Sequence, residues 1–222
     1  MRILNLIFLI LFFLTSNGFA FEKELLVDVK KLIPTIKLDI RYFTNENFIG
    51  KKIDAYEAPK CFLTLEATKA LSAVQKELLD KNLSLKLFDC YRPQSAVNHF
   101  VRWAKDLNDT KMKSKYYPRV EKRDLFRDGY IAIKSGHSRG STLDVTIVDL
   151  NNSELDMGTG FDYFDLKSHT ENSYISLTSL KNRLFLREIM NKHGFKNLKE
   201  EWWHYCLINE PYLFKYFDIV IK

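Results

Sequence analysis

Apolar residues recur every three or four positions in two stretches of the chain, which is the spacing of one buried face of a helix. The first stretch covers residues 64–81 and its apolar positions include Leu65, Leu71, Val74 and Leu78. Thr64 can cap the first turn with its hydroxyl. We therefore predict a helix over residues 64–81.

The second stretch covers residues 179–193, where Leu180, Leu184 and Ile189 follow the same spacing. Gly194 comes directly afterwards, in the position where a glycine commonly ends a helix. A further helix is predicted over residues 94–107, because Pro93 is well suited to the start of a helix.

Strands are predicted where polar and apolar residues alternate or where β-branched residues cluster. Residues 83–88 alternate, residues 145–150 form an apolar β-branched run, and residues 201–207 form a last apolar strand. Shorter extended pieces are expected at 32–36, 38–42 and 129–133, and residues 111–128 are expected to be irregular. Because strands and helices do not alternate regularly, the pattern predicts a single α+β domain, with a mostly antiparallel central sheet and flanking helices.

The first 20 residues have the pattern of a secretory signal peptide. Arg2 precedes an apolar run from Ile3 to Leu14, and Gly18 and Ala20 stand where a signal peptidase cleaves. A run of about a dozen apolar residues is short for a membrane span, which needs about 20. We expect residues 1–20 to be removed, residues 21–222 to form the mature domain, and no stable membrane insertion after cleavage.

Composition excludes some classes of protein. The formal net charge of +6 is spread along the chain without a basic-aromatic stripe, so no nucleic-acid partner is expected. Three cysteines, Cys61, Cys90 and Cys206, are too few for a disulfide scaffold and contain no Cys-x-x-Cys pair. One disulfide with a spare thiol and three free thiols both remain open.

Two motifs carry residues suited to a metal ion. Ser135-Gly-His137-Ser-Arg-Gly140-Ser-Thr-Leu-Asp144 ends where the predicted strand 145–150 begins, and Glu201-Trp-Trp-His204 lies near the C-terminus. A carboxylate at the edge of a buried strand is costly unless it is paired or bound to a metal. Two histidines and one carboxylate, with a fourth position open, are typical of a catalytic zinc site in a cleft.

Two further residues are candidates for catalysis. Glu201 lies three residues before His204 and could take a proton from a water activated by the metal. The guanidinium of Arg92 could stabilise negative charge that develops on a carbonyl oxygen. Taken alone, Arg92 would more simply be a surface residue after a turn.

Four motifs in order resemble a known family. They are Asp89-x-Tyr91-Arg92-Pro93-Gln94, Ser135-x-His137-Ser-Arg139-Gly140-Ser141-x-x-Asp144, Met157-Gly-Thr-Gly-Phe161-Asp162 with Ser168-His169, and Glu201-x-Trp203-His204. The chain, from about residue 25 to 217, resembles the D-alanyl-D-alanine dipeptidases of the VanX type, which belong to the zinc D,D-peptidases.

The resemblance implies roles for individual residues. His137, Asp144 and His204 would hold one Zn²⁺ per chain, Glu201 would act as general base and acid, and Arg92 would stabilise the transition state. Two more, Ser135 and Tyr91, would line the substrate pocket. No chemical role is assigned to the segment of Phe161 and Asp162.

The leading hypothesis is therefore hydrolysis of the small dipeptide D-Ala-D-Ala outside the cytoplasm, in the periplasm or beyond the cell. Its use would be in cell-wall (peptidoglycan) turnover or salvage of the dipeptide. One alternative is a D,D-carboxypeptidase that trims longer peptidoglycan peptides, and another is a non-catalytic zinc-bearing module that binds peptidoglycan. Segments 111–128 and 151–168 favour a site closed around a dipeptide.

Overall fold

A five-stranded sheet forms the centre of the part of the chain that the computed structural model describes, residues 25–222. The spatial order of its strands is β2-β4-β5-β7-β6, and only the β2–β4 pair is parallel. The strands, in chain order, are β2 (Lys37–Leu38), β4 (Leu83–Asp89), β5 (Thr142–Asp149), β6 (Phe195–Asn197) and β7 (His204–Leu207). The two long strands, β4 and β5, are buried along nearly their whole length.

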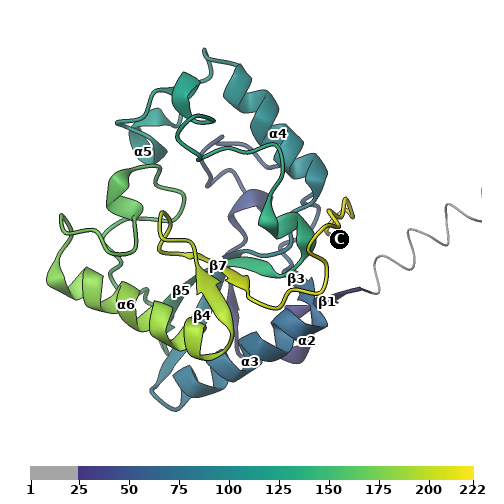
Figure 1. Ribbon diagram of the computed structural model, residues 1–222, viewed down its shortest axis with the longest axis vertical. Helices are drawn as coiled ribbons and strands as arrows, with labels where there is room; N and C mark the ends of the chain where they lie inside the picture. Colours follow the sequence, from purple (N-terminus) through teal and green to yellow (C-terminus); the bar gives the residue numbers. More distant parts are fainter. Residues whose placement is uncertain (1–24) are drawn as a thin grey trace, which may run out of the picture.

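Three helices account for most of the α structure. Helix α3 (Leu65–Leu79) begins at Thr64, whose hydroxyl accepts a hydrogen bond from the backbone of Ala67, as a capping threonine should. Helix α6 (Leu177–Lys192) is followed by Gly194 in the left-handed conformation, with φ of +85°. In Figure 1, α3 and α6 lie together on one side of the sheet strands, whereas α4 (Gln94–Lys105) lies at the opposite side of the view.

The remaining elements are short. Strands β1 (Leu26–Asp28) and β3 (Phe62–Thr64) form a separate antiparallel pair. The other helical turns are α2 (Val29–Leu32), η1 (Arg41–Phe43), α5 (Lys113–Tyr116), η2 (Lys122–Asp124), η3 (Gly136–Arg139) and η4 (Leu166–Ser168). Residues 111–128, predicted to be irregular, contain the short helical turns α5 and η2 separated by irregular chain.

The predicted α+β architecture, with a mostly antiparallel central sheet and flanking helices, is confirmed. The helices predicted over 64–81, 94–107 and 179–193 are observed within two residues of each predicted end. The strands predicted at 83–88, 145–150 and 201–207 correspond to β4, β5 and β7, although β5 starts earlier and β7 starts later than expected.

The three short extended pieces predicted from the sequence are wrong apart from Leu38, which belongs to β2. Residues 32–36 begin at Leu32, the last residue of helix α2, whose first turn is capped by the Asp28 side chain accepting a hydrogen bond from the Lys30 backbone. Residues 38–42 contain the end of the two-residue strand β2 and the start of η1. Residues 129–133 lie in no strand of the described chain, because Gly129 turns the backbone with φ of +82°.

The cysteines adopt one of the two arrangements left open by the sequence. Cys61 and Cys90 form a disulfide, and Cys206 is a free thiol. The predicted signal peptide, residues 1–20, lies outside the described residues. Across residues 25–222, none of the helices has both the length and the apolar character needed to cross a membrane.

Candidate metal centre

Strand register places two of the predicted metal ligands side by side. Asp144 on β5 pairs directly with His204 on β7, and on its other side it pairs with Asp89 on β4. Side chains at directly paired positions of neighbouring strands lie on the same face of a sheet. Two polar motifs about 60 residues apart in the sequence therefore meet at the end of β5.

The third predicted ligand, His137, comes from the helical turn η3, just before β5. The Ser135 hydroxyl caps this turn by accepting a hydrogen bond from the His137 backbone at 3.3 Å. Gly140 ends it with φ of +79°, and a Cβ there would come within 2.5 Å of the Leu26 side chain. The glycine thus allows the sharp turn that carries His137 back over the start of β5.

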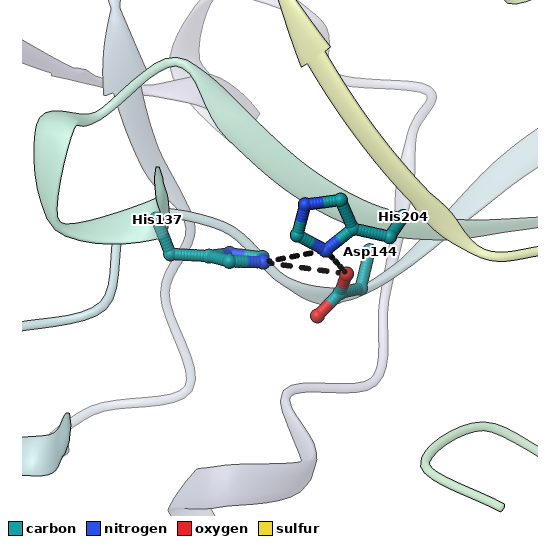
Figure 2. Close-up of side chains that lie close together, drawn as sticks. All are labelled: His137, Asp144 and His204. Atoms are coloured by element: carbon teal, nitrogen blue, oxygen red, sulfur yellow. Dashed lines mark hydrogen bonds and ion pairs between the residues drawn. The ribbon is translucent and has the colours of Figure 1, made fainter. Parts of the chain in front are cut away.

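The three side chains converge, as Figure 2 shows. His204 Nδ1 lies 3.2 Å from Asp144 Oδ1, and His137 Nε2 lies 3.4 Å from Asp144 Oδ1 and 3.3 Å from His204 Nδ1. Three ligands at roughly 2.0–2.1 Å from a tetrahedral ion would be about 3.3–3.4 Å apart. The observed separations therefore fit one zinc-sized ion among the three atoms.

The state of the Asp144 carboxylate supports the same conclusion. Asp144 is 1% exposed, and its Oδ1 atom, which faces both histidines, is buried without a hydrogen bond of good geometry. A buried carboxylate oxygen left unbonded is costly. A cation bound among the three donors would satisfy it.

Hydrogen bonding selects the nitrogen that His137 presents. Its Nδ1 donates to the carbonyl oxygen of Cys90 at 2.7 Å, so Nε2 is free to face Asp144 and His204. A ligating histidine usually makes such a bond with its second nitrogen, which fixes the ring and its tautomer.

The electrostatics of the metal-free site also favour ligation. Burial lowers the pKa of His137, so its imidazole is neutral and can bind a cation. Burial works against ionisation of Asp144, but the two neighbouring histidines outweigh it and lower the pKa of this carboxyl. The site therefore offers an ionised carboxylate together with a neutral imidazole.

Glu201 lies beside the cluster and is 20% exposed at its side chain. Its Oε2 atom is 3.4 Å from His204 Nδ1, one turn before β7 begins. Burial raises the pKa of the Glu201 carboxyl, and the negative charge of Asp144 adds to this effect. Such a carboxyl can both accept and release a proton near the cluster.

Arg92 is part of the site and not a surface residue after a turn. Its Nε donates to Asp89 Oδ2 at 2.9 Å, and a terminal nitrogen lies 3.4 Å from Asp144 Oδ2. Its guanidinium also stacks over the rings of Tyr42 and Phe100, about 5 Å from each centroid. These contacts fix a positive charge next to the oxygen of Asp144 that faces away from the histidines.

The two predicted pocket residues have different surroundings. Ser135 lies at the cluster, where it holds the turn that carries His137. Tyr91 is 2% exposed, and its hydroxyl is bonded to the backbone carbonyl and N–H of Ile219 at 3.1 and 2.6 Å. The Tyr91 hydroxyl is therefore engaged by the C-terminal segment, and the structure does not bring it to the metal ligands.

Two buried acids near the site received no role from the sequence. Asp89 accepts hydrogen bonds from Arg92 and from the Tyr56 hydroxyl, at 2.9 and 2.6 Å. Asp162 accepts one from the Tyr42 hydroxyl at 2.8 Å, and burial raises its pKa well above the ordinary range, with Asp144 adding to the effect. Both lie in motifs noted in the sequence, but only their burial distinguishes them from ordinary loop acids.

A cavity of about 1360 Å³ reaches Glu201. Its walls come from residues 119–130, 165–174 and 198–201, and they carry Arg119, Tyr130, Lys167 and Tyr174. Arg119 and the buried Asp165 form an ion pair that links the first two walls. A substrate that contacts Glu201 thus has ample space beside it.

Comparison with known proteins gives a consistent result. A family model described as D-ala-D-ala dipeptidase matches residues 22–222. A D-alanyl-D-alanine dipeptidase of Enterococcus faecalis is 41% identical over 208 residues, which cover 93% of this chain and 100% of the relative. One of Streptomyces coelicolor is 40% identical over 207 residues, covering 93% and 99%.

A more distant likeness is to a solved structure of the vancomycin-resistance D,D-pentapeptidase VanY in complex with Zn(II). It covers 69% of this chain and 77% of that chain, with a TM-score of 0.43 and 14% identity.

Proposed function

The chain belongs to the D-Ala-D-Ala dipeptidase family, and on that premise we propose that it hydrolyses D-alanyl-D-alanine to two molecules of D-alanine with the help of one zinc ion. The single observation that carries this proposal is the convergence of His137, Asp144 and His204 beside Glu201. Two imidazoles and a carboxylate that leave a fourth position open are suited to a catalytic zinc.

Zinc, Glu201 and Arg92 would have different chemical roles in the reaction. When bound, zinc supplies a Lewis acid that polarises the scissile carbonyl and acidifies water in the site. Glu201 accepts a proton from the attacking water and returns it to the leaving amine, for which its raised pKa is suited. Arg92 holds a fixed positive charge for the developing oxyanion.

A direct test compares the wild type with Glu201→Gln. The variant should keep one zinc per chain, since no ligand is changed, and should release D-alanine about 10²–10⁴-fold more slowly. Glu188→Gln, which removes an exposed acid of helix α6 outside the cavity, is the matched control and should behave as the wild type. A wild-type protein that binds zinc but cleaves no peptide would instead support a peptidoglycan-binding module.

The cavity beside Glu201 favours a second candidate function. A volume of about 1360 Å³ exceeds the roughly 300–1,000 Å³ of a typical small-molecule pocket, and a dipeptide is smaller than most such ligands. The same site could therefore act as a D,D-carboxypeptidase on longer peptides ending in D-Ala-D-Ala. Rates on the dipeptide and on a pentapeptide stem separate the two functions, since a true dipeptidase leaves the pentapeptide intact.

We also propose that the chain acts outside the cytoplasm, in the periplasm or beyond the cell, in turnover of the wall or salvage of the dipeptide. The signal-like pattern of residues 1–20 supports export, and an oxidising compartment would suit the Cys61–Cys90 disulfide. Fractionation of cells that express the full chain tests the location, and recovery of the protein with its N-terminus intact in the cytoplasm would contradict it.

A further inference from the structure

The Cys61–Cys90 disulfide lies directly behind the metal centre. Cys61 immediately precedes β3, Cys90 immediately follows β4, and both residues are at most 1% exposed. The residue before Cys90 is Asp89, which pairs with Asp144 across the sheet. The disulfide thus anchors the end of β4 at the point where this strand reaches the metal ligands.

Cys90 is in contact with a ligand through its backbone. Its carbonyl oxygen accepts the hydrogen bond from His137 Nδ1 at 2.7 Å, and this bond leaves Nε2 free for the cluster. The Cys90 carbonyl is therefore the nearest contact that fixes the His137 ring, and Asp89 Oδ2 lies 3.4 Å from the same nitrogen. Outer partners of this kind contribute to the affinity of a site for its metal.

Strand β3 connects the disulfide to the other side of the centre. The Thr64 backbone donates to the Gly140 carbonyl at 2.7 Å, and the Thr64 and Ser141 hydroxyls lie 2.8 Å apart. Gly140 and Ser141 join the turn that carries His137 to the strand that carries Asp144. Strand β3 is therefore bonded both to the turn that supplies His137 and, through the disulfide, to Cys90, whose carbonyl orients His137.

The disulfide is the covalent link between the start of β3 and the end of β4. Apart from the disulfide, β3 is tied to the end of β4 by a hydrogen bond from the Tyr91 backbone to the Phe62 carbonyl, at 2.9 Å. If the disulfide is opened, the two sulfurs become non-bonded atoms that cannot remain at bonding distance in a close-packed interior. Opening or removing the bond therefore frees β3 and the Cys90 peptide to shift relative to each other, and each contacts the segment of a ligand.

We propose that the Cys61–Cys90 disulfide positions His137 for metal binding, so that the oxidised protein holds zinc more tightly than the reduced one. The inference rests on the proposed function only for the identity of the metal. It makes the two cysteines positioning residues and not catalytic ones. The centre would then be fully competent in an oxidising compartment and weakened in a reducing one.

The first experiment measures zinc affinity by competition with a chromophoric chelator. Cys61→Ala with Cys90→Ala removes the bond without leaving thiols that could capture the metal, and we expect zinc to bind roughly 10–100-fold more weakly. Leu78→Ala, which changes a fully buried residue near the end of α3, is the control for lost stability alone and should bind zinc as the wild type does. Unchanged affinity in the double variant would overturn the inference.

A second experiment avoids the variant, in case it folds poorly. The wild-type protein loaded with zinc is treated with a water-soluble phosphine. The phosphine supplies two electrons and becomes its oxide with oxygen from water, while the Sγ–Sγ bond breaks and each sulfur gains one proton. We expect zinc to pass to a metallochromic dye as the two new thiols appear.

The two hypotheses fail in different ways. Zinc that stays bound after both new thiols have been detected and then alkylated, so that they cannot hold the metal themselves, would refute the positioning role, whatever the enzyme does to peptides. Oxidised wild type that binds zinc but leaves D-Ala-D-Ala intact would refute the proposed function and leave the redox effect on zinc affinity measurable.

Discussion

Arg92 gives the most informative single substitution, because its side chain faces two carboxylates at once. Nε is 2.9 Å from Asp89 Oδ2, and a terminal nitrogen is 3.4 Å from Asp144 Oδ2. In Arg92→Lys the charge remains, but one ammonium on a flexible stem cannot reproduce the planar fork that spans both acids. The variant therefore tests geometry rather than charge.

Two magnitudes follow from this environment. Breaking a buried ion pair costs about 3–5 kcal/mol. A lysine can still pair with one of the two carboxylates, so we expect Arg92→Lys to lower the free energy of unfolding by about 1–3 kcal/mol. A lost donor to a developing oxyanion costs about 2.7–4 kcal/mol, which is roughly 10²–10³ in kcat. We thus expect kcat on D-Ala-D-Ala to fall about 100-fold or more at saturating zinc.

The assay is release of D-alanine by the zinc-saturated variant, with urea unfolding measured in parallel. Arg102→Lys is the matched control, because Arg102 is an exposed arginine of the neighbouring helix α4, where it pairs with the exposed Asp54, and should behave as the wild type. If zinc-saturated Arg92→Lys keeps nearly the wild-type kcat and loses only stability, then Arg92 merely holds Asp89 and Asp144, and the oxyanion argument is refuted.

Three further predictions concern the metal and the loop beside it. Burial lowers the pKa of His204, but the hydrogen bond and charge of Asp144 outweigh it and leave that pKa raised. Since only neutral imidazole binds zinc, zinc affinity should fall as the pH drops through this raised pKa. Calorimetry should then show a heat of zinc binding that differs between buffers of unlike ionisation enthalpy, because binding releases a proton. Removal of zinc by a chelator should lower the melting temperature, because a ligand at 100 times its Kd stabilises the folded state by about 2.7 kcal/mol; an unchanged melting temperature would argue against a resident metal. Arg183 is fully buried and donates to three backbone carbonyls in the segment 157–169. In urea unfolding, Arg183→Met should therefore lower the free energy of unfolding by about 3 kcal/mol or more. A loss below about 1 kcal/mol would contradict this role.

Local physics explains which parts of the fold were predictable. Helices α3 and α6 have apolar residues at helical spacing and clear end signals, Thr64 for the first and Gly194 for the second, and both were predicted nearly to the residue. The wrong predictions concern residues 32–42 and 129–133, which are short and surrounded by turns. In such segments contacts with distant parts of the chain outweigh the weak preference of a few residues.

The candidate site was likewise predictable from the sequence only in part. The sequence supplied the chemical types of the ligands, because two histidines and an acid at a strand edge have few other uses. It could not supply the register that pairs Asp144 with His204 and Asp89, which depends on hydrogen bonds between strands far apart in the chain. Nor could it choose between a disulfide and free thiols, since that depends on how close the folded chain brings Cys61 to Cys90.

The sequence by itself therefore determined the long helices and the long strands, which depend on residues near one another in the chain. It also supplied the candidate ligands, through their chemical types and through the resemblance of their motifs to a known family. Only the tertiary structure decided that Arg92 contacts both Asp89 and Asp144, that the Tyr91 hydroxyl binds the C-terminal segment, and that the Cys90 carbonyl orients His137. The physical reason is that burial and hydrogen-bond partners are properties of the packed chain, and neighbours in sequence do not fix them.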